Sequence, residues 1–208
     1  MQSWGYDENG WPSGFGSGAV NGLGLKYQQK YLRAEETDSP QNNDNTIINL
    51  EYNGKNVHFY YDVNPFYVDT LNGEVIDEFI KSTHQVYKQK LGEEFSDMAG
   101  FFTDEPQYQR WHTPYTTMVA DYFREHYGQD IFDYIGLLFV EANGYRTFRY
   151  RYWRAMQHLL LNNFSKKVYS WCQANDVKLT GHYVEEVSIG YQIMCCAGVM
   201  PFYEYEHI

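Results

Sequence analysis

Hydrophobic and polar residues alternate in two neighbouring runs of the first third of the chain. The segments TIINLEY (46–52) and KNVHFYYDV (55–63) are rich in β-branched and aromatic residues and are joined by Asn53 and Gly54. Both turn residues tolerate positive φ, so the pattern predicts a β-hairpin near residues 46–61.

Further along, apolar residues fall at helical spacing. The segment 74–91 shows this pattern, with Asn72 placed to cap its start and Gly92 to end it. A second helix is expected from Thr113, acting as its N-cap, to a stop at Gly128. Both predictions rest on residues at the helix ends, because the backbone N–H and C=O groups there lack partners within the helix and need capping.

The longest helical pattern lies in the second half of the chain. A short helix near 130–139 leads into a long helix from Tyr145 to Asn175. The apolar stripe of the long helix consists of Phe148, Tyr152, Met156, Leu159, Leu160, Phe164, Val168 and Trp171. Such a stripe predicts that one face of this helix packs against the core.

Two further runs, MAGFFTDE (98–105) and DVKLTGHYVEE (176–186), have the composition of short strands. Strands and helices therefore alternate, which predicts an α/β fold with a parallel sheet, and we expect a parallel (β/α) barrel of the TIM type. A closed eight-stranded barrel typically has about 250 residues. This chain is therefore expected to form only part of one, as a single domain over residues 1–208 with the hairpin near 46–61 as an insertion. An open sheet or completion by a second chain are the alternatives.

Composition narrows the classes of partner. The chain has 208 residues, of which 43% are hydrophobic, so it can build a core. A net charge of -11 argues against nucleic acid, because phosphate binding needs a basic surface. Aromatic residues make up 19%, and their flat faces suit sugar rings.

Targeting signals are not evident. The sequence holds no run of 18 apolar residues and no signal peptide pattern, so we expect no membrane partner and a cytoplasmic location. The three cysteines, Cys172, Cys195 and Cys196, fit neither a disulfide framework nor a zinc site. They are expected to be reduced core residues.

The first 24 residues form a glycine-rich segment without a helical or strand period. Its glycines do not match a phosphate-binding loop, since no Gly-Lys-Ser/Thr follows them. Long loops inside a domain are usually functional or disordered. The acidic pair Asp7 and Glu8 and the nearby Trp11 favour a functional loop.

Acidic pairs at the ends of strands are the candidate chemistry. Glycoside hydrolysis needs two carboxyl groups, one of which must stay protonated. Glu105 follows Phe101 and Phe102, and desolvation by aromatic neighbours raises the pKa of a carboxyl group, so Glu105 is the candidate acid. Glu185 and Glu186 are its candidate partners. A solvated acidic turn is the alternative interpretation of each pair.

Four neighbouring residues are candidates for substrate binding. Asp104 and His182 lie on the two strand ends, where a histidine can orient a substrate hydroxyl group, although a lone strand histidine is more often an ordinary core residue. Both are also potential metal ligands, but no HExxH-type spacing supports a metal site. Trp111 and His112 follow the first strand end, where they either line a subsite or lie on the surface.

Several of these motifs together resemble a known family. YDENGWPSG (6–14), VDTLN (68–72), FFTDEP (101–106), LTGHYVEE (179–186) and FYEYEHI (202–208) are similar to segments of the TIM-barrel domain of the α-L-rhamnosidase-like glycoside hydrolases. These are large bacterial enzymes, and the resemblance runs from Trp4 to Ile208.

The resemblance implies hydrolysis of a terminal sugar of a glycoside or polysaccharide by single displacement, with inversion. It assigns Glu105 as the general acid and Glu185 or Glu186 as the base or a sugar ligand. Asp7, Glu8 and Trp11 would close over the sugar. Some members of the family use calcium to hold the sugar, but no ligand set in this sequence fixes a calcium site.

The sequence also departs from the family. Members have strands before YDENGWPSG and strand–helix units after EYEHI. The expectation is therefore a partial barrel that associates with itself or with a missing half, because an open parallel sheet leaves apolar edges uncovered. A catalytically inactive carbohydrate-binding fragment and a metal-dependent hydrolase using the same acidic residues are the alternative functions.

Overall fold

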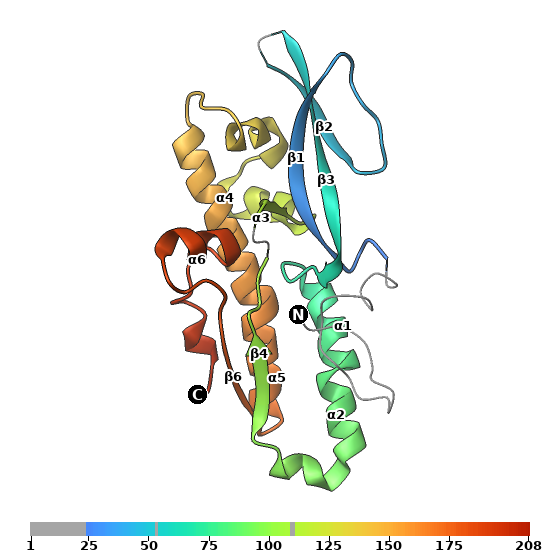
Figure 1. The fold of residues 1–208 in the computed structure, drawn as a ribbon, viewed down its shortest axis with the longest axis vertical. Coiled ribbons are helices and arrows are strands. Elements are labelled where there is room, and N and C mark those ends of the chain that lie inside the picture. The colour runs from blue at the N-terminus through green and yellow to red at the C-terminus, as the bar shows by residue number, and fades with distance from the viewer. Residues whose placement is uncertain (1–23, 53, 109–110) are drawn as a thin grey trace.

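The computed structural model describes residues 24–52, 54–108 and 111–208. A four-stranded sheet lies at one end and a pair of strands at the other, with long helices running between them (Figure 1). The strands are β1 (Gln28–Thr37), β2 (Thr46–Tyr52), β3 (Lys55–Val68), β4 (Gly100–Asp104), β5 (Thr113–Tyr115) and β6 (Lys178–His182). The α-helices are α1 (Gly73–Ser82), α2 (His84–Leu91), α3 (Met118–Tyr127), α4 (Tyr145–Leu160), α5 (Lys166–Ala174) and α6 (Ile189–Cys195).

The larger sheet has the order β2-β3-β1-β5, and all of its pairings are antiparallel. The predicted hairpin is confirmed, since Tyr52 of β2 faces Lys55 of β3 across the turn. The hairpin is not an insertion, however. The polar segment QQKYLRAEET of β1, which has no clear strand pattern, pairs with β3 along its length.

The expected parallel barrel of the TIM type is wrong. In the described ranges the parallel pairing is that of β4 with β6, and the four remaining strands form an antiparallel sheet. The alternation of helices and strands was the basis for the barrel. The direction of a strand depends on its partner, however, and β1 pairs antiparallel with both β3 and β5, which makes this sheet antiparallel.

The helix expected from Thr113 begins later. Thr113–Tyr115 instead pairs with Lys30–Leu32 of β1 as strand β5, and Pro114 and Tyr115 are buried there. Helix α3 therefore starts at Met118. Its predicted end is confirmed, because Gly128 caps it with a left-handed φ of 62°.

The remaining predicted helices are found with local changes. Asn72 caps α1 by accepting a hydrogen bond from the backbone N–H of Glu74, and Thr83 divides the expected helix into α1 and α2. The long helix is continuous in path but contains a π-helical turn at Leu161–Ser165 between α4 and α5. The short helix near 130–139 forms two 3₁₀ turns, Ile131–Asp133 and Ile135–Leu138.

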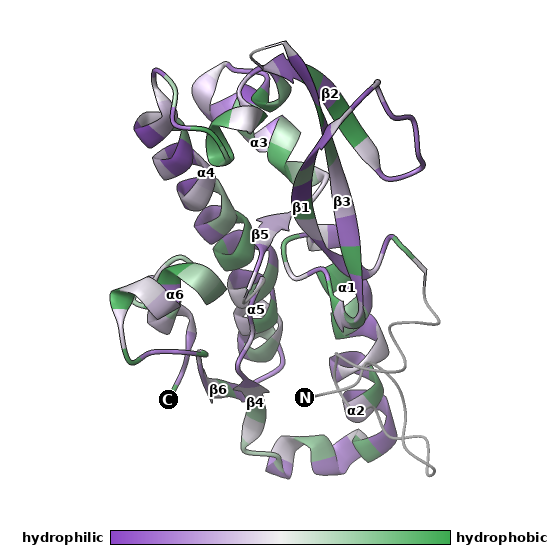
Figure 2. Ribbon diagram, turned by 45° about the horizontal axis from the view of Figure 1, so that its top comes forward, coloured by the Kyte–Doolittle hydropathy of each residue, from purple (hydrophilic) through white to green (hydrophobic). Residues whose placement is uncertain are grey.

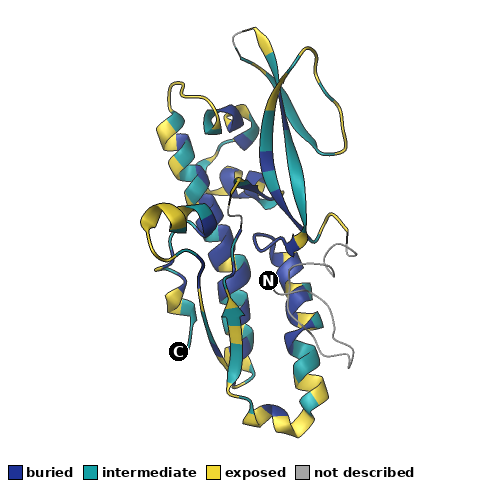
Figure 3. Cartoon of the chain, in the orientation of Figure 1, coloured by how far each residue is buried: buried dark blue, intermediate teal, exposed yellow. Residues whose placement is uncertain are grey.

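The core lies where the helices meet the strands. Helices α1, α3 and α5 alternate between hydrophobic and hydrophilic segments (Figure 2), and their buried residues gather on the inner faces (Figure 3). Tyr152 of α4 is fully buried and donates a hydrogen bond to the carbonyl of Pro114, which ties α4 to β5. In the described ranges, no helix is both long and apolar enough to cross a membrane.

A buried polar group connects the sheet to the start of α1. The Lys30 ammonium lies 3.8 Å from the Asp69 carboxylate, and Thr116 donates a hydrogen bond to the same carboxylate at 3.2 Å. Burial raises the pKa of Asp69 to about 6, while the charge of Lys30 opposes this shift. The segment VDTLN that resembles the rhamnosidase-like family thus serves here as a hydrogen-bonded turn between β3 and α1.

Candidate functional site

The two acidic strand ends meet in space. Strands β4 and β6 are parallel and in register, with Asp104 opposite His182. The His182 Nε2 and Asp104 Oδ1 atoms are 3.2 Å apart, and both side chains are about half exposed. The backbone N–H of Glu105 continues the ladder by donating to the carbonyl of His182 at 3.1 Å. The carboxyl ends of both strands therefore open on the same edge, as expected for parallel strands.

Glu105 turns the chain away from the sheet. Its φ is 53°, a left-handed value that is uncommon for a residue other than glycine. Buried Tyr67 donates its hydroxyl hydrogen to the Glu105 carbonyl at 3.4 Å, and buried Pro106 follows directly. The Glu105 side chain is partly buried, and its backbone is held from both sides. Such strained conformations are often found at functional sites.

Glu185 and Glu186 lie on the turn that follows β6. Glu185 also has a left-handed φ, at 59°, and its side chain is partly buried. Glu186 is exposed, but one of its carboxylate oxygens accepts a hydrogen bond from the Tyr183 backbone N–H at 3.3 Å. The side chain of Gln192 on α6 donates to the Glu186 carbonyl at 3.1 Å. The turn is therefore closed on itself and anchored to α6.

A fourth glutamate, Glu206, joins this group. The backbone N–H of its neighbour His207 donates to the carbonyl of Leu179 at 2.8 Å, so the end of the chain lies along β6. Burial raises the pKa of Glu206; the charge of Glu186 adds to the shift and that of His182 opposes it. Among the described residues, the buried Oε1 of Glu206 has no hydrogen-bond partner. The Glu206 carboxyl group thus lies close enough to Glu186 and His182 for their charges to affect its pKa.

No local pattern in the sequence marks Glu206 as a site residue. It belongs to the FYEYEHI motif, but that segment has neither strand spacing nor a pair of adjacent carboxylates. In the structure it contains a 3₁₀ turn, Tyr203–Tyr205, and Glu206 itself is extended. The repeated spacing of aromatic and acidic residues there was the one available signal.

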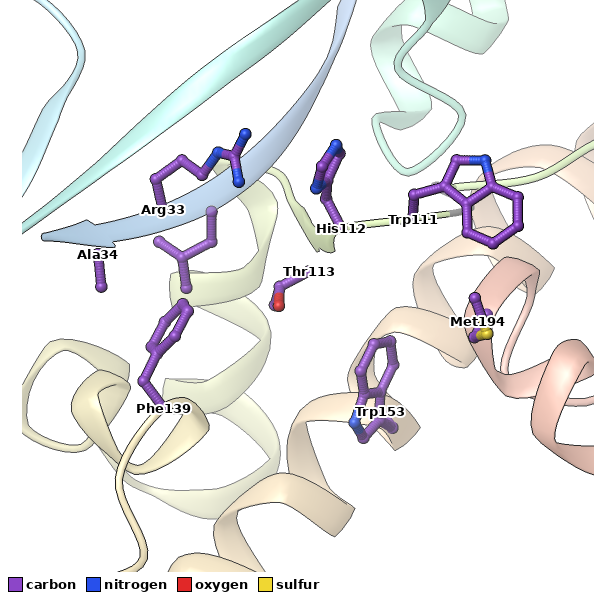
Figure 4. A pocket seen from close by; sticks show the side chains of 9 residues that line it. Arg33, Ala34, Trp111, His112, Thr113, Phe139, Trp153 and Met194 are labelled. Carbon is purple, nitrogen blue, oxygen red and sulfur yellow. The ribbon is translucent and has the colours of Figure 1, made fainter.

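Trp111 and His112 occupy a different place. They line a pocket of about 380 Å³ (Figure 4). The pocket is lined by Leu32, Arg33, Ala34, Trp111, His112, Thr113, Phe139, Trp153 and Met194. Its lining therefore contains no carboxylate from the ends of β4 and β6. The His112 ring stacks on Tyr31, with centroids 4.5 Å apart. Burial and the charge of Arg33 lower the pKa of His112, which favours the neutral ring.

The N-terminal candidates and the cysteines complete the comparison with the sequence predictions. Asp7, Glu8 and Trp11 lie outside the described residues. Cys195 and Cys196 are buried, as predicted for core residues, and so is Cys172. Burial raises the pKa of the Cys172 and Cys196 thiols to about 12.

The described residues do not fit a calcium site. No group of three or more His, Cys, Asp or Glu side chains in the described ranges is arranged to hold a metal ion. The His182 ring already lies against Asp104, and Glu186 accepts a backbone hydrogen bond. We therefore derive no chemical step that involves calcium.

Comparison with known proteins gives a distant structural likeness. No family model matches the chain, and no curated protein matches its sequence. The structure is similar to part of a rhamnosidase from Novosphingobium sp. PP1Y, with a TM-score of 0.54 and 17% identity. The likeness covers 75% of this chain and 16% of the rhamnosidase. The fold is related to part of a glycoside hydrolase. At this identity the likeness concerns the fold alone.

Proposed function

We propose that the acidic edge formed by β4 and β6 is a glycosidase site that acts on a terminal sugar of a glycoside or polysaccharide. The observation that carries this proposal is the parallel register of the two strands, which brings Asp104 to His182 and carries Glu105 and the Glu185–Glu186 turn to the same edge. The distant fold likeness to a rhamnosidase supports the same chemical class.

The proposed reaction is a single displacement. One carboxylic acid donates its proton to the glycosidic oxygen as the bond from that oxygen to the anomeric carbon breaks. One carboxylate takes a proton from water as the water oxygen bonds to the opposite face of the same carbon. Each product then carries a hydroxyl group, and the two glutamates exchange protonation states. In inverting enzymes the two carboxyl groups are about 6.5–9.5 Å apart, which leaves room for the water.

Two glutamates are candidates for the acid. Glu105 is supported by its position at the strand end and by the family resemblance. Glu206 is supported by its environment, because burial raises its pKa and so favours the protonated form that an acid requires. Glu185 and Glu186 are the candidate bases. The Asp104–His182 pair presents an acceptor and a donor that suit a sugar hydroxyl group.

Hydrolysis of a panel of aryl glycosides by the chain and its variants tests this proposal. Replacing the general acid by glutamine should reduce kcat by about 10²–10⁴-fold, the usual contribution of general acid–base catalysis. The loss should be smaller for dinitrophenyl glycosides, because a good leaving group needs little protonation. Replacing the base should reduce turnover for both kinds of substrate. Comparison of Glu105→Gln, Glu206→Gln, Glu185→Gln and Glu186→Gln therefore assigns the roles.

The matched control is Glu51→Gln, an exposed glutamate on β2 at the other end of the molecule. It should hydrolyse the panel like the unmodified chain. Full activity in both Glu105→Gln and Glu206→Gln would contradict the assignment of the acid. Sugar binding without turnover across the panel would instead identify a carbohydrate-binding site, and loss of activity with a chelator would identify a metal-dependent hydrolase.

A further inference from the structure

The pocket that contains Trp111 is built from segments far apart in the sequence. One wall comes from β1, with Leu32 and Ala34, and from Phe139. Trp153 of α4 and Met194 of α6 lie across from them (Figure 4). Because five separate segments converge there, the pocket is a feature of the folded chain rather than a gap beside one loop.

Trp153 is a fixed aromatic surface. It is partly buried, and its ring packs against Tyr108 and Tyr152 with centroids 6.1 and 6.0 Å away. Trp111 is 67% exposed and lies above Met194, on the side of the pocket away from Phe139 (Figure 4). A packed indole such as Trp153 can hold a ligand face with little loss of entropy.

Polar groups lie between and above these apolar walls. The Thr113 hydroxyl points into the middle of the pocket (Figure 4). Arg33 lies above the upper rim, on the face of β1 opposite Leu32 and Ala34, where its Nε–H donates to Asp62 at 3.2 Å (Figure 4). His112 is at the same rim, and its lowered pKa favours the neutral ring. A neutral imidazole offers one donor and one acceptor.

We propose that this pocket binds a neutral pyranose unit, with the C–H face of the sugar on Trp153 and its hydroxyl groups toward Thr113. A neutral ligand fits better than an anion, because Arg33 faces away from Trp153 and is already paired with Asp62. The Thr113 hydroxyl group can both donate and accept a hydrogen bond, as a sugar hydroxyl group requires. The choice of a sugar rests on the proposed function, and the pocket would hold a different unit of the same glycoside from the one at the acidic edge.

Direct binding measurements on the 208-residue chain test the inference. The probes are methyl β-D-glucopyranoside, methyl α-D-mannopyranoside and methyl α-L-rhamnopyranoside, followed by tryptophan fluorescence and saturation-transfer NMR. At least one probe should bind saturably, with ring C–H protons receiving the strongest transfer. Loss of the aromatic surface in Trp153→Leu should weaken binding about tenfold, which corresponds to about 1.4 kcal/mol.

Further variants separate a contact from a folding defect. Trp111→Ala changes an exposed side chain, and Thr113→Val keeps the shape of β5 while removing the hydroxyl group. Each should weaken sugar binding several-fold without changing the melting temperature. Trp153→Phe should keep the packing on Tyr108 and bind with intermediate affinity. The matched control is Trp171→Phe, a tryptophan outside this pocket that packs on Phe101, and it should bind like the unmodified chain.

Three results would overturn the inference. The first is no saturable binding of any probe, and the second is binding that the pocket variants leave unchanged. The third is equal binding of cyclohexanol with no effect of Thr113→Val, which would identify a purely apolar groove for another kind of partner. The glycosidase proposal fails separately: Glu105→Gln and Glu206→Gln should leave the affinity of the pocket unchanged, whatever their effect on turnover.

Discussion

At the scale of single residues, the described chain places polar groups in surroundings that decide their protonation. The clearest case outside the acidic edge is His84, which packs against Phe79, Phe101 and Trp171. Burial lowers its pKa to about 4, and its Nδ1 has no hydrogen-bond partner in the described part of the chain. A histidine in such surroundings favours the neutral form because desolvation penalises the cation.

This environment predicts that His84 makes folding dependent on pH. The pKa of the folded state, about 4, is below the unfolded value, so the stabilisation is complete above pH 6.5 and is lost as the pH falls toward 4. The difference of about 2.5 pKa units corresponds to about 3 kcal/mol. In His84→Phe the loss of unfolding free energy between pH 7 and pH 4 should be smaller by this amount, as measured by urea titration.

His126→Gln serves as the control, because His126 is exposed on α3. Its unfolding free energy should follow the same pH dependence as that of the unmodified chain. A His84→Phe protein with an unchanged pH dependence would show that the His84 ring is hydrated or paired when the protein is folded.

At the scale of elements, the close approach of β4 and β6 is what assembles the acidic edge. A Cβ atom added at Gly181 would lie 2.3 Å from both the carbonyl oxygen and the side-chain oxygen of Thr103. Such a distance cannot be accommodated without moving one strand. The absence of a side chain at Gly181 therefore permits the register that brings Asp104 to His182.

Gly181→Ala should consequently destabilise the chain by about 1–3 kcal/mol, the usual cost of overpacking. It should also lower the activity or sugar affinity of the acidic edge. Gly190→Ala is the matched control, since the nearest atom to its added Cβ is 3.9 Å away and it lies within α6. The control should be neutral or stabilising by up to about 1 kcal/mol. Equal urea midpoints for the two variants would contradict the steric explanation.

Helix α1 offers a second test at this scale. The Asn72 side chain accepts the backbone hydrogen bond of Glu74 and so satisfies one free donor at the helix start. Asn72→Ala should reduce the unfolding free energy by about 1 kcal/mol, whereas Asn72→Asp should retain most of it. A loss of equal size in both variants would mean that Asn72 acts through another contact than the cap.

At the scale of the whole molecule, local signals predicted the elements better than their arrangement. Asn53-Gly54, Asn72 and Gly128 each mark a turn or helix end by a local conformational preference, and the structure has an element boundary at or beside each. Strand β1 was not predicted, because its sequence is polar and its strand conformation depends on pairing with β3 and β5. The missed strand is also the reason why the barrel prediction failed.

In the candidate site, too, local patterns predict some residues, whereas tertiary contacts bring in others that no local pattern marks. Glu105 and Glu186 follow strands, so their position at a common edge can be predicted from the pattern of a parallel pair. Glu206 reaches that edge because the end of the chain binds to Leu179 of β6, a tertiary contact without a local signal. The Trp111 pocket likewise depends on Trp153 and Met194, which are brought there by the packing of α4 and α6.

The pairing of Asp104 with His182 also constrains the order of folding. These residues are 78 positions apart, and the intervening chain includes β5 and helices α3, α4 and α5. Closing such a long loop costs entropy before any contact between its ends offsets it. Helices form within microseconds, whereas contacts distant in sequence form more slowly. We therefore expect the acidic edge to assemble late in folding, so that a partly folded chain would have its helices but no assembled carboxylates.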